Sequence, residues 1–358
     1  RIATRLPPAL ASDVVAQVLA LAAPAASVQT WHGACLAIAE CARHRLVLPS
    51  VLAPVEHDAR AQQVAHVLAD ALLYDEPRGT YSVGSNVREA AAFACWALAR
   101  ATPPSSLVAV LGVLLPPLLT TATLDREATC RRAAAAALQE LVGRQGAAVF
   151  GSTARGIELV TTVDDAAVAS RRHAALVVAP HVAQMSADWR SALVAHIEAE
   201  LLAHWDRAVR VLAAQALALL VADGSGARAV LLKAVEGAQS SDVARRHGSL
   251  LAAAAVLERV VEEQLLPLPL DHELPEALVD VVPHAEQSRM LSGRGGEYLR
   301  EAACELITAV AHAKLTMKRQ QQQHQQTGPT STSTPAASGG QSQLAAAFTR
   351  VRAAAAAA

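Results

Sequence analysis

A pattern that recurs roughly every 40 residues limits what this chain can fold into more than any other feature of its sequence. It is clearest in residues 201–220, where Asp206 can cap a helix, Arg210 follows four residues later, and small or apolar residues follow Arg210. Related segments carry a polar residue at the same place. We call these residues the anchors: His32, Arg88, Arg131, Arg171, Arg210, Arg246 and Arg300. Units of this length with two helices each are typical of HEAT and armadillo solenoids.

The residues that follow the anchors suit closely packed helices. The gaps between successive anchors are 56, 43, 40, 39, 36 and 54 residues. Three residues after each anchor stands a Cys, Ala or Ser, and seven residues after it stands an apolar residue. Because alanine is abundant in the chain, a single copy can arise by chance, but the regular spacing of the middle copies argues against chance for the set. The sequence predicts an all-α fold, a HEAT/armadillo-type α-solenoid of antiparallel helix pairs with about seven repeats.

Composition divides the chain into three parts. Residues 1–316 carry the repeats. Residues 317–343 are rich in Gln, Ser, Thr and Gly and cannot bury a core, so we expect a disordered insert there. Residues 344–358 then begin a further helical segment. The first residue is Arg rather than Met, so we expect the chain to be a fragment of a longer protein.

Composition also argues against several classes of partner. The chain is 53% hydrophobic but only 3% aromatic, so its core is expected to consist of Ala, Leu and Val. Lys plus Arg number 31 against 32 Asp plus Glu, a balance that disfavours nucleic acid or an anionic membrane as partner. No apolar run reaches the ~18 residues that span a bilayer. The five scattered cysteines are expected to act as small hydrophobic residues in a reducing cytosol.

Four segments interrupt the helical pattern. Pro116 and Pro117 are expected to bend or break one outer helix, and Pro180 to interrupt an inner helix. Residues 75–86 read as a polar turn that contains glycine. Residues 147–163 show no clear period and therefore give no prediction.

Two motifs carry weak chemical signals. His196, Glu200 and His204 share one helix face, but the two histidines are two turns apart, about 12 Å, too far for one zinc ion. A polar helix face is the favoured interpretation, with a metal site as the alternative. Residues 292–300, SGRGGEYLR, superficially resemble a phosphate loop, but they lack its Lys and hydroxyl and follow no strand, so we expect a turn between helices. No local arrangement of nucleophile and base predicts an active site, and we expect no cofactor.

The residues near the anchors allow two interpretations. Asn86, Asp125, Asp206 and Asp242 are predicted helix caps. Pairs such as Asp206 with Arg210, or Asp242 with Arg246, can cap helices and bridge adjacent repeats, or they can contact a partner directly. The structural role is favoured.

Motifs outside the repeat pattern resemble one known family. They are Trp31-His32-Gly33, Asn86-Val87-Arg88, Gly143-Arg144-Gln145-Gly146 and His204-Trp205-Asp206. Together with the longer stretches WHGACLAIAECARHRLVLPSVL and GRGGEYLREAACELI, they resemble tubulin-folding cofactor D, also called tubulin-specific chaperone D, over roughly residues 1–316. The resemblance is to the middle to C-terminal part of that family's HEAT-repeat region.

This resemblance implies a non-enzymatic chaperone of the cytoplasm and the microtubule cytoskeleton. It implies binding of β-tubulin and, together with tubulin-folding cofactors C and E and an Arf-like small GTPase, assembly and disassembly of the tubulin heterodimer. The same complex promotes GTP hydrolysis by tubulin, while the protein itself binds no nucleotide. Residues 151–173 lack the aromatic residues of the family's corresponding segment, so no site is carried over to residues 150–170.

A curved stack of helix pairs can bind one state of a folded partner without side-chain chemistry. We expect five arginines of the inner helices to lie near such a surface, and some of them to contact acidic tubulin. They are Arg88, Arg131, Arg132, Arg210 and Arg246. The alternatives are a general HEAT-repeat scaffold, of the transport or phosphatase regulatory type, and a hydrolase with a dispersed active site.

Overall fold

The structure is a computed structural model that describes residues 5–48, 54–146, 150–263, 273–287, 289–293 and 295–327. The described residues are almost entirely helical, and the chain divides into two compact units, Arg1–Leu193 and Val194–Ala358. Within each unit the helices pack in pairs, so the predicted all-α solenoid fold is confirmed.

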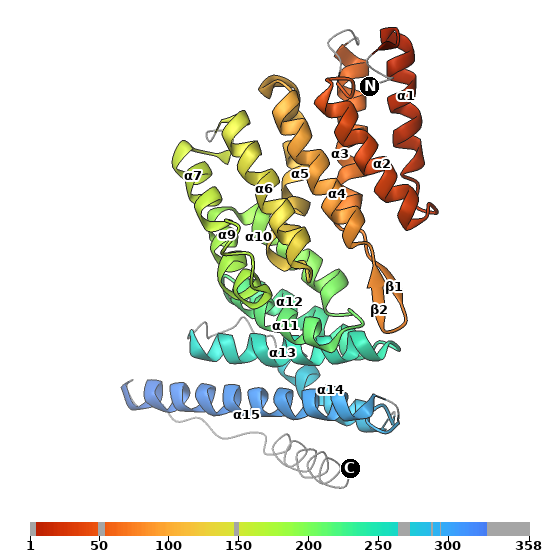
Figure 1. Cartoon of the computed structure of the whole chain (residues 1–358). Helices are drawn as coiled ribbons and strands as arrows, with labels where there is room; N and C mark the ends of the chain where they lie inside the picture. The colour runs from red at the N-terminus through yellow and green to blue at the C-terminus, as the bar shows by residue number, and fades with distance from the viewer. Residues whose placement is uncertain are drawn as a thin grey trace. The chain divides into compact units, whose positions relative to one another are not determined.

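Unit 1 begins with two rows of helices (Figure 1). An inner row, in which each helix packs on the next, consists of α2 (Val28–Arg43), α4 (Ser85–Ala101) and α6 (Ala128–Gln145). An outer row consists of α1 (Pro8–Leu21), α3 (Pro54–Leu72) and α5 (Pro104–Leu124). The unit continues with α7 (Thr153–Thr162), α8 (Arg171–His173), the π-helical turn η3 (Ala174–Val178), α9 (Ala179–Met185) and α10 (Ala187–His196), whose last residues belong to unit 2.

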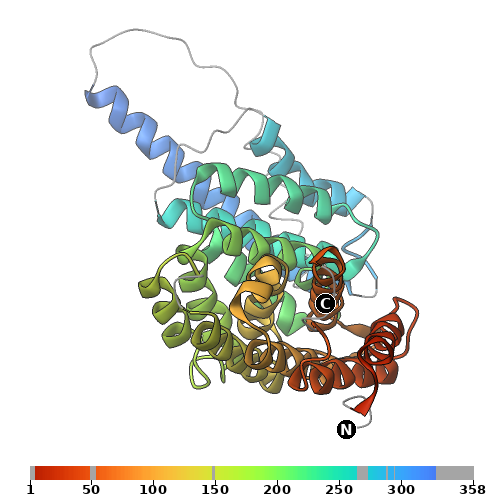
Figure 2. The same ribbon diagram turned by 90° about the horizontal axis from the view of Figure 1, so that it is seen from above.

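Unit 2 repeats this arrangement, and the turned view shows its helices from above (Figure 2). Its inner row consists of α11 (Arg207–Leu220), α13 (Val243–Glu262) and α15 (Gly296–Thr327). The π-helical turn η4 (Ile197–Leu201), α12 (Gly224–Ala238) and α14 (Glu273–Gln287) complete the unit. Helix α12 packs on α13 and α14, and α14 also packs on α15.

The positions that follow the anchors form the core, as the spacing predicted. Every residue three or seven positions after an anchor is at most 5% exposed. The first set is Cys35, Ala91, Ala134, Ala174, Ala213, Ser249 and Ala303. The second set is Ala39, Cys95, Leu138, Val178, Leu217, Ala253 and Ile307. The small side chains of the first set let neighbouring helices of a row approach closely, so the repeat pattern is a packing pattern.

The prolines behave differently from one another. Helix α5 runs without a break through Pro116 and Pro117, so of the two expected outcomes, a bend or a break, the break is wrong. Buried leucines on both sides of the prolines, including Leu114 and Leu118, hold the helix by packing although backbone hydrogen bonds are lost. Pro180 lies just after the π-helical turn η3 and has no backbone N–H to donate. The expected interruption of the helix is therefore a π-helical turn followed by the new helix α9.

Two segments contain elements that the sequence did not predict. Within the expected turn at residues 75–86, β1 (Glu76–Arg78) and β2 (Tyr81–Val83) form an antiparallel hairpin. Gly79 has φ of 71°, as the first central residue of a two-residue hairpin turn requires. In the segment without a clear period, Ser152 caps α7 by accepting a hydrogen bond from the Arg155 amide at 3.1 Å.

The structure describes only the first part of the C-terminal segments that the sequence predicted. Helix α15 continues through Thr327, past the expected domain boundary at residue 316, because Gln, Lys and Arg favour helix. The rest of the expected disordered insert and the further helical segment, residues 328–358, lie outside the described residues. None of the described helices is long and apolar enough to cross a membrane.

Candidate partner-binding surface

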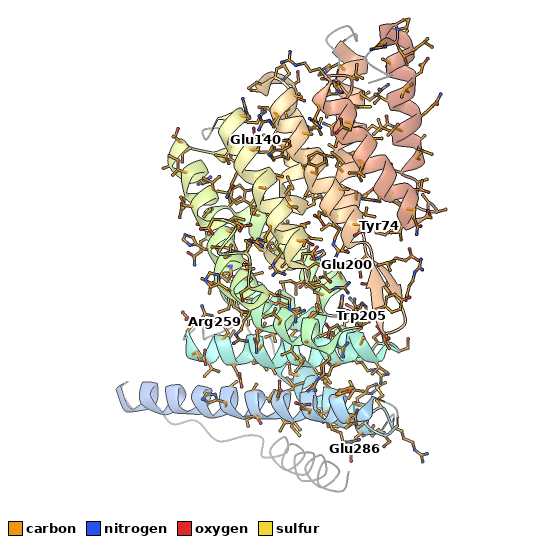
Figure 3. The ribbon with its side chains drawn as sticks, viewed as in Figure 1. Tyr74, Glu140, Glu200, Trp205, Arg259 and Glu286 are labelled. Carbon is orange, nitrogen blue, oxygen red and sulfur yellow. The ribbon has the colours of Figure 1, made fainter. Side chains whose placement is uncertain are left out.

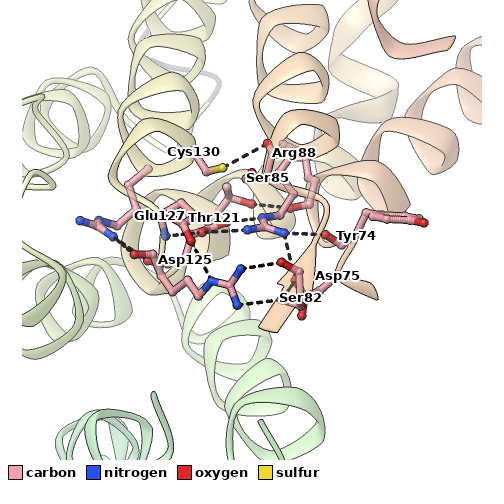
Figure 4. Close-up of polar contacts among 12 residues, drawn as sticks. Tyr74, Asp75, Ser82, Ser85, Arg88, Thr121, Asp125, Glu127 and Cys130 are labelled. Carbon is pink, nitrogen blue, oxygen red and sulfur yellow. Dashed lines mark hydrogen bonds and ion pairs between the residues drawn. The ribbon is translucent and has the colours of Figure 1, made fainter. Parts of the chain in front are cut away.

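The anchor Arg88 contacts three residues from two other segments. Its side chain is 6% exposed and forms an ion pair with Asp125, with Nε donating to Oδ2 at 2.6 Å (Figure 4). It also donates to the Tyr74 carbonyl oxygen at 2.7 Å and to Asp75 at 3.3 Å. Burial lowers the pKa of the guanidinium, but the Asp125 carboxylate outweighs burial and the net shift is upward. Arg88 therefore ties α4 to the end of α3 and the end of α5.

Arg131 has the same structural role one repeat later. The residue is 2% exposed, and its guanidinium donates to four backbone carbonyl oxygens at 2.7–3.0 Å. Two of them precede α6, at Asp125 and Arg126, and two belong to the next repeat, at Val168 and Ala169. Burial lowers the pKa of this guanidinium, but carbonyl oxygens on all sides compensate for the lost water.

Arg210 links α11 to α13 of unit 2 through a hydrogen bond to a histidine. It is 5% exposed and donates to the carbonyl oxygens of His204 at 2.6 Å and Trp205 at 3.0 Å. Its Nε lies 3.0 Å from Nδ1 of His247, which must accept the hydrogen bond and therefore be neutral. Burial, followed by the charges of Arg210 and Arg207, lowers the pKa of His247 to about 4.

These contacts give most of the predicted partner-binding arginines a structural role, and their contact with a partner stays a prediction. Arg246, 8% exposed, donates to the Ser241 carbonyl oxygen at 3.1 Å. Arg88, Arg131 and Arg210 are thus buried links between neighbouring segments, and Arg246 is buried against the turn that precedes its own helix. Of the five, only Arg132 is exposed, and its Nε donates to Asp165 at 2.6 Å.

Two of the four predicted caps are confirmed. Asp206 accepts a hydrogen bond from the Ala208 amide at 2.8 Å, and Asp242 accepts one from the Ala244 amide at 3.0 Å. Asn86 is not a cap, because α4 begins at Ser85 and Gly84, with φ of 133°, takes the N-cap position.

Asp125 is not the N-cap of α6 either. That helix begins at Ala128, with Glu127 at its N-cap, and Asp125 accepts from the Glu127 amide at 2.8 Å, one residue before the helix. The carboxylate lies close to a cap position, but its main partner is Arg88.

An apolar groove runs along α4 in the inner row of unit 1, between α2 and α6, and the sequence did not predict it. Its volume is about 650 Å³. It exists because α6 contributes only alanines opposite the aromatic side chains of α4. The main lining residues, which define the apolar groove, are Leu36, Glu89, Phe93, Trp96, Ala133 and Ala136. Leu36 is 40% exposed, and the rings of Phe93 and Trp96 stack with centroids 5.8 Å apart.

Charged residues mark the two ends of the apolar groove. At one end the Arg100 guanidinium lies 4.7 Å from the centre of the Trp96 ring. Glu140, labelled on α6 in Figure 3, pairs with Arg144 at 2.8 Å and with Arg100 at 3.6 Å, so two cations share one carboxylate. At the other end Glu89 is exposed. The groove is therefore positive at its Arg100 end and negative at its Glu89 end.

The hairpin between α3 and α4 is a rigid projection of unit 1. At its base Ser82 donates to Asp75 at 2.7 Å, and Arg126 donates to the Ser82 hydroxyl at 2.7 Å and to its carbonyl oxygen at 3.3 Å (Figure 4). Arg126 thus covers one strand edge, and Pro77 on the other strand has no N–H. The edges are poorly suited to pairing with another strand, so the hairpin offers side chains such as Tyr81, which is 54% exposed.

Unit 2 presents an acidic surface on its inner row. A groove of about 640 Å³ between α13 and α15 defines it, with Glu258, Glu297, Glu301 and Glu305 against one arginine, Arg300, in its lining. Partial burial, then the charges of Glu301 and Glu258, raise the pKa of Glu305. We call this groove the acidic groove.

The remaining sequence motifs make local structural contacts. Among the described residues no group of three or more His, Cys, Asp and Glu side chains is placed to hold a metal ion. His204 Nδ1 instead accepts a hydrogen bond from the Asp206 amide at 3.0 Å. The described part of residues 292–300 is a turn that leads into α15, as expected. Cys35, Cys95 and Cys130 are buried thiols whose pKa is raised by burial.

Comparison with known proteins agrees with the motifs. Residues 1–152 match a family model described as tubulin-specific chaperone D-like, ARM repeats. The chain is also 29% identical over 296 residues to tubulin-specific chaperone D of Dictyostelium discoideum. That alignment covers 82% of this chain but only 19% of the relative, so the chain spans a small part of that protein's length. Both comparisons confirm the resemblance that the sequence motifs predicted: this chain resembles tubulin-specific chaperone D.

Proposed function

We propose that this chain is part of a tubulin-folding chaperone and that it binds β-tubulin. The observation that carries the proposal is the similarity to tubulin-specific chaperone D over 296 residues, which extends across both units. The structure supports a binding function, because the inner row of unit 1 exposes an apolar groove with charged ends. Patches of this kind on soluble proteins commonly mark contacts with other proteins.

The proposed mechanism needs no active site in the chain itself. A stack of helix pairs that binds one conformation of tubulin more tightly than another shifts the equilibrium between them. Together with tubulin-folding cofactors C and E and an Arf-like small GTPase, the protein would assemble and disassemble the α/β-tubulin heterodimer and promote GTP hydrolysis by tubulin. This activity belongs to the cytoplasm and the microtubule cytoskeleton.

A binding experiment with purified components tests the proposal. The 358-residue chain is immobilised, and recovery of β-tubulin, α-tubulin and the Arf-like GTPase is quantified separately. We expect selective recovery of β-tubulin. A correctly folded chain that recovers no tubulin contradicts the proposal and favours the alternative, a general HEAT-repeat scaffold of the transport or phosphatase regulatory type.

A further inference from the structure

We propose that the apolar groove of unit 1 binds an amphipathic helix of tubulin, about three turns long, with an acidic and a basic side chain at opposite ends of its apolar face. The identity of the partner rests on the proposed function. The shape and chemistry of its helix are inferred from the groove.

The length of the groove determines the length of the bound helix. The groove follows α4 from Asn86 to Trp96, and its two charged residues on α4 are Glu89 and Arg100, which lies one turn beyond Trp96. Glu89 and Arg100 are eleven residues apart in the same helix, which corresponds to about 16 Å along its axis. A partner helix of about three turns covers this distance.

The width and floor of the groove favour a helix over an extended peptide. Ala133 and Ala136 of α6 leave space beside the larger residues Phe93, Trp96 and Leu36. Hydrophobic grooves between helices bind amphipathic helices through apolar side chains spaced three and four residues apart. An extended peptide would need backbone donors and acceptors on the groove walls, and the walls are helix faces whose backbone groups are already paired.

The charges determine the orientation of the helix. Arg100 and Arg144 both pair with the single carboxylate of Glu140, so the net charge at this end of the groove is positive. Glu89, which is exposed in the groove lining, gives the other end a negative charge. An acidic side chain of the partner therefore belongs at the Arg100 end, and a basic one at the Glu89 end.

The test compares one substitution in the groove with a matched substitution outside it. Leu36→Glu places a carboxylate in the groove at a side chain that is 40% exposed. Val108→Glu places the same charge on the outer helix α5 at a side chain that is 48% exposed. Binding of the full chain to purified α/β-tubulin is measured for both variants, and circular dichroism confirms that both are folded.

We expect Leu36→Glu to weaken tubulin binding at least about tenfold and Val108→Glu to leave it within about twofold. Equal binding by the two variants and the unchanged chain overturns the inference while the proposed function stands. If the unchanged chain binds no tubulin, the proposed function fails and tubulin is overturned as the occupant.

A second probe tests the groove without tubulin. It is a stapled peptide of about three helical turns, with leucines on one face, a Glu at one end and a Lys at the other. We expect it to bind the unchanged chain, to bind Arg100→Glu more weakly, and to bind Arg100→Glu better again when its own Glu is replaced by Lys. Equal peptide affinity in all of these combinations, or no binding at all, overturns the inference.

A second copy of the chain is the main competing occupant. Sedimentation of the unchanged chain and of Leu36→Glu distinguishes the two cases. We expect both to be monomeric at micromolar concentration, and a dimer that Leu36→Glu dissociates would overturn the assignment of the groove to a tubulin helix.

Discussion

The inner rows of the two units bury the same positions of each repeat but expose side chains of different chemistry. One and five residues after its anchor, α4 carries Glu89 and Phe93, whereas α15 carries Glu301 and Glu305. The first surface includes the apolar groove and the second the acidic groove. The positions three and seven residues after the anchors are buried in both rows. Packing therefore restricts one set of positions in each repeat, while the other set is free to determine which partner is bound.

The anchors of the two units also differ in how their charge is satisfied. Arg88 in unit 1 pairs with a carboxylate, Asp125, whereas Arg210 in unit 2 donates to a neutral histidine, His247. A carboxylate accepts hydrogen bonds down to low pH, but a histidine that gains a proton cannot accept one. The two units should therefore differ in their response to acid as well as in their surfaces.

The largest effect is expected at the Arg88 ion pair. Arg88→Ala leaves the Asp125 carboxylate buried without its partner, which should lower the free energy of unfolding of unit 1 by about 3–5 kcal/mol. Hydrogen exchange of α4 measures this loss, with α13 of unit 2 as internal reference. Arg132→Ala, which breaks an exposed ion pair with Asp165, should cost less than about 1 kcal/mol. Equal losses in the two variants would contradict the structural role of Arg88.

A glycine in unit 2 tests how closely its inner row is packed. A methyl group on Gly248 of α13 would overlap the backbone of Leu202, including its carbonyl oxygen. Gly248→Ala should therefore destabilise unit 2 by about 1–3 kcal/mol or more. Gly33→Ala in α2 of unit 1, where a methyl group meets no atom within 4 Å, should stabilise by about 0.5–1 kcal/mol. Urea unfolding of both variants measures the difference, and a stabilising Gly248→Ala would show that the packing is wrong.

Acid should weaken unit 2 through His247. Its pKa falls from 6.5 to about 4 on folding, so the folded state binds a proton less readily than the unfolded state. This stability is fully present above pH 6.5 and is lost as the pH falls toward 4, by on the order of 2–3 kcal/mol. Hydrogen exchange of α11 and α13 between pH 7 and pH 4.5 measures the loss. The dependence should flatten in His247→Gln, and an unchanged slope in that variant would contradict the assignment.

The smallest effect is expected at Glu305 in the acidic groove. Its pKa is raised in the folded state, so ionisation opposes folding, and the penalty disappears as the pH falls toward the ordinary glutamate range. Glu305→Gln should therefore stabilise unit 2 slightly at pH 7, by less than about 1 kcal/mol, and have no effect near pH 4. Thermal unfolding at the two pH values measures this, and a destabilising substitution at pH 7 would show that Glu305 has a favourable partner.

The sequence predicted the framework of the fold much better than its surface. Burial of Ala91 and Cys95 follows from local periodicity, so spacing alone located them. The burial of Arg131 does not follow from its own helix, because its carbonyl partners at Val168 and Ala169 belong to the next repeat. For the same reason, three of the five arginines expected at a partner surface, Arg88, Arg131 and Arg210, link segments that lie far apart in the sequence.

The sequence contains a signal for the aromatic residues of the apolar groove but not for the groove itself. Phe93 and Trp96 stand three residues apart in a chain with few aromatic residues, and this was a usable signal. What the sequence does not contain is the gap beside them, which depends on α6 placing Ala133 and Ala136 opposite. The β hairpin was missed because a proline and two glycines resemble an ordinary turn, whereas Arg126 from a distant segment holds it in place.

Hydrogen exchange of the full chain with and without purified tubulin distinguishes the apolar groove from the acidic groove as the tubulin contact, because it reports on both inner rows in one experiment. We expect tubulin to slow exchange in α2 and α4 around Leu36 and Phe93, and to leave exchange in α13 and α15 around the acidic groove unchanged. Protection confined to α13 and α15 in the presence of bound tubulin would contradict it, and would place the tubulin contact on the acidic surface of unit 2.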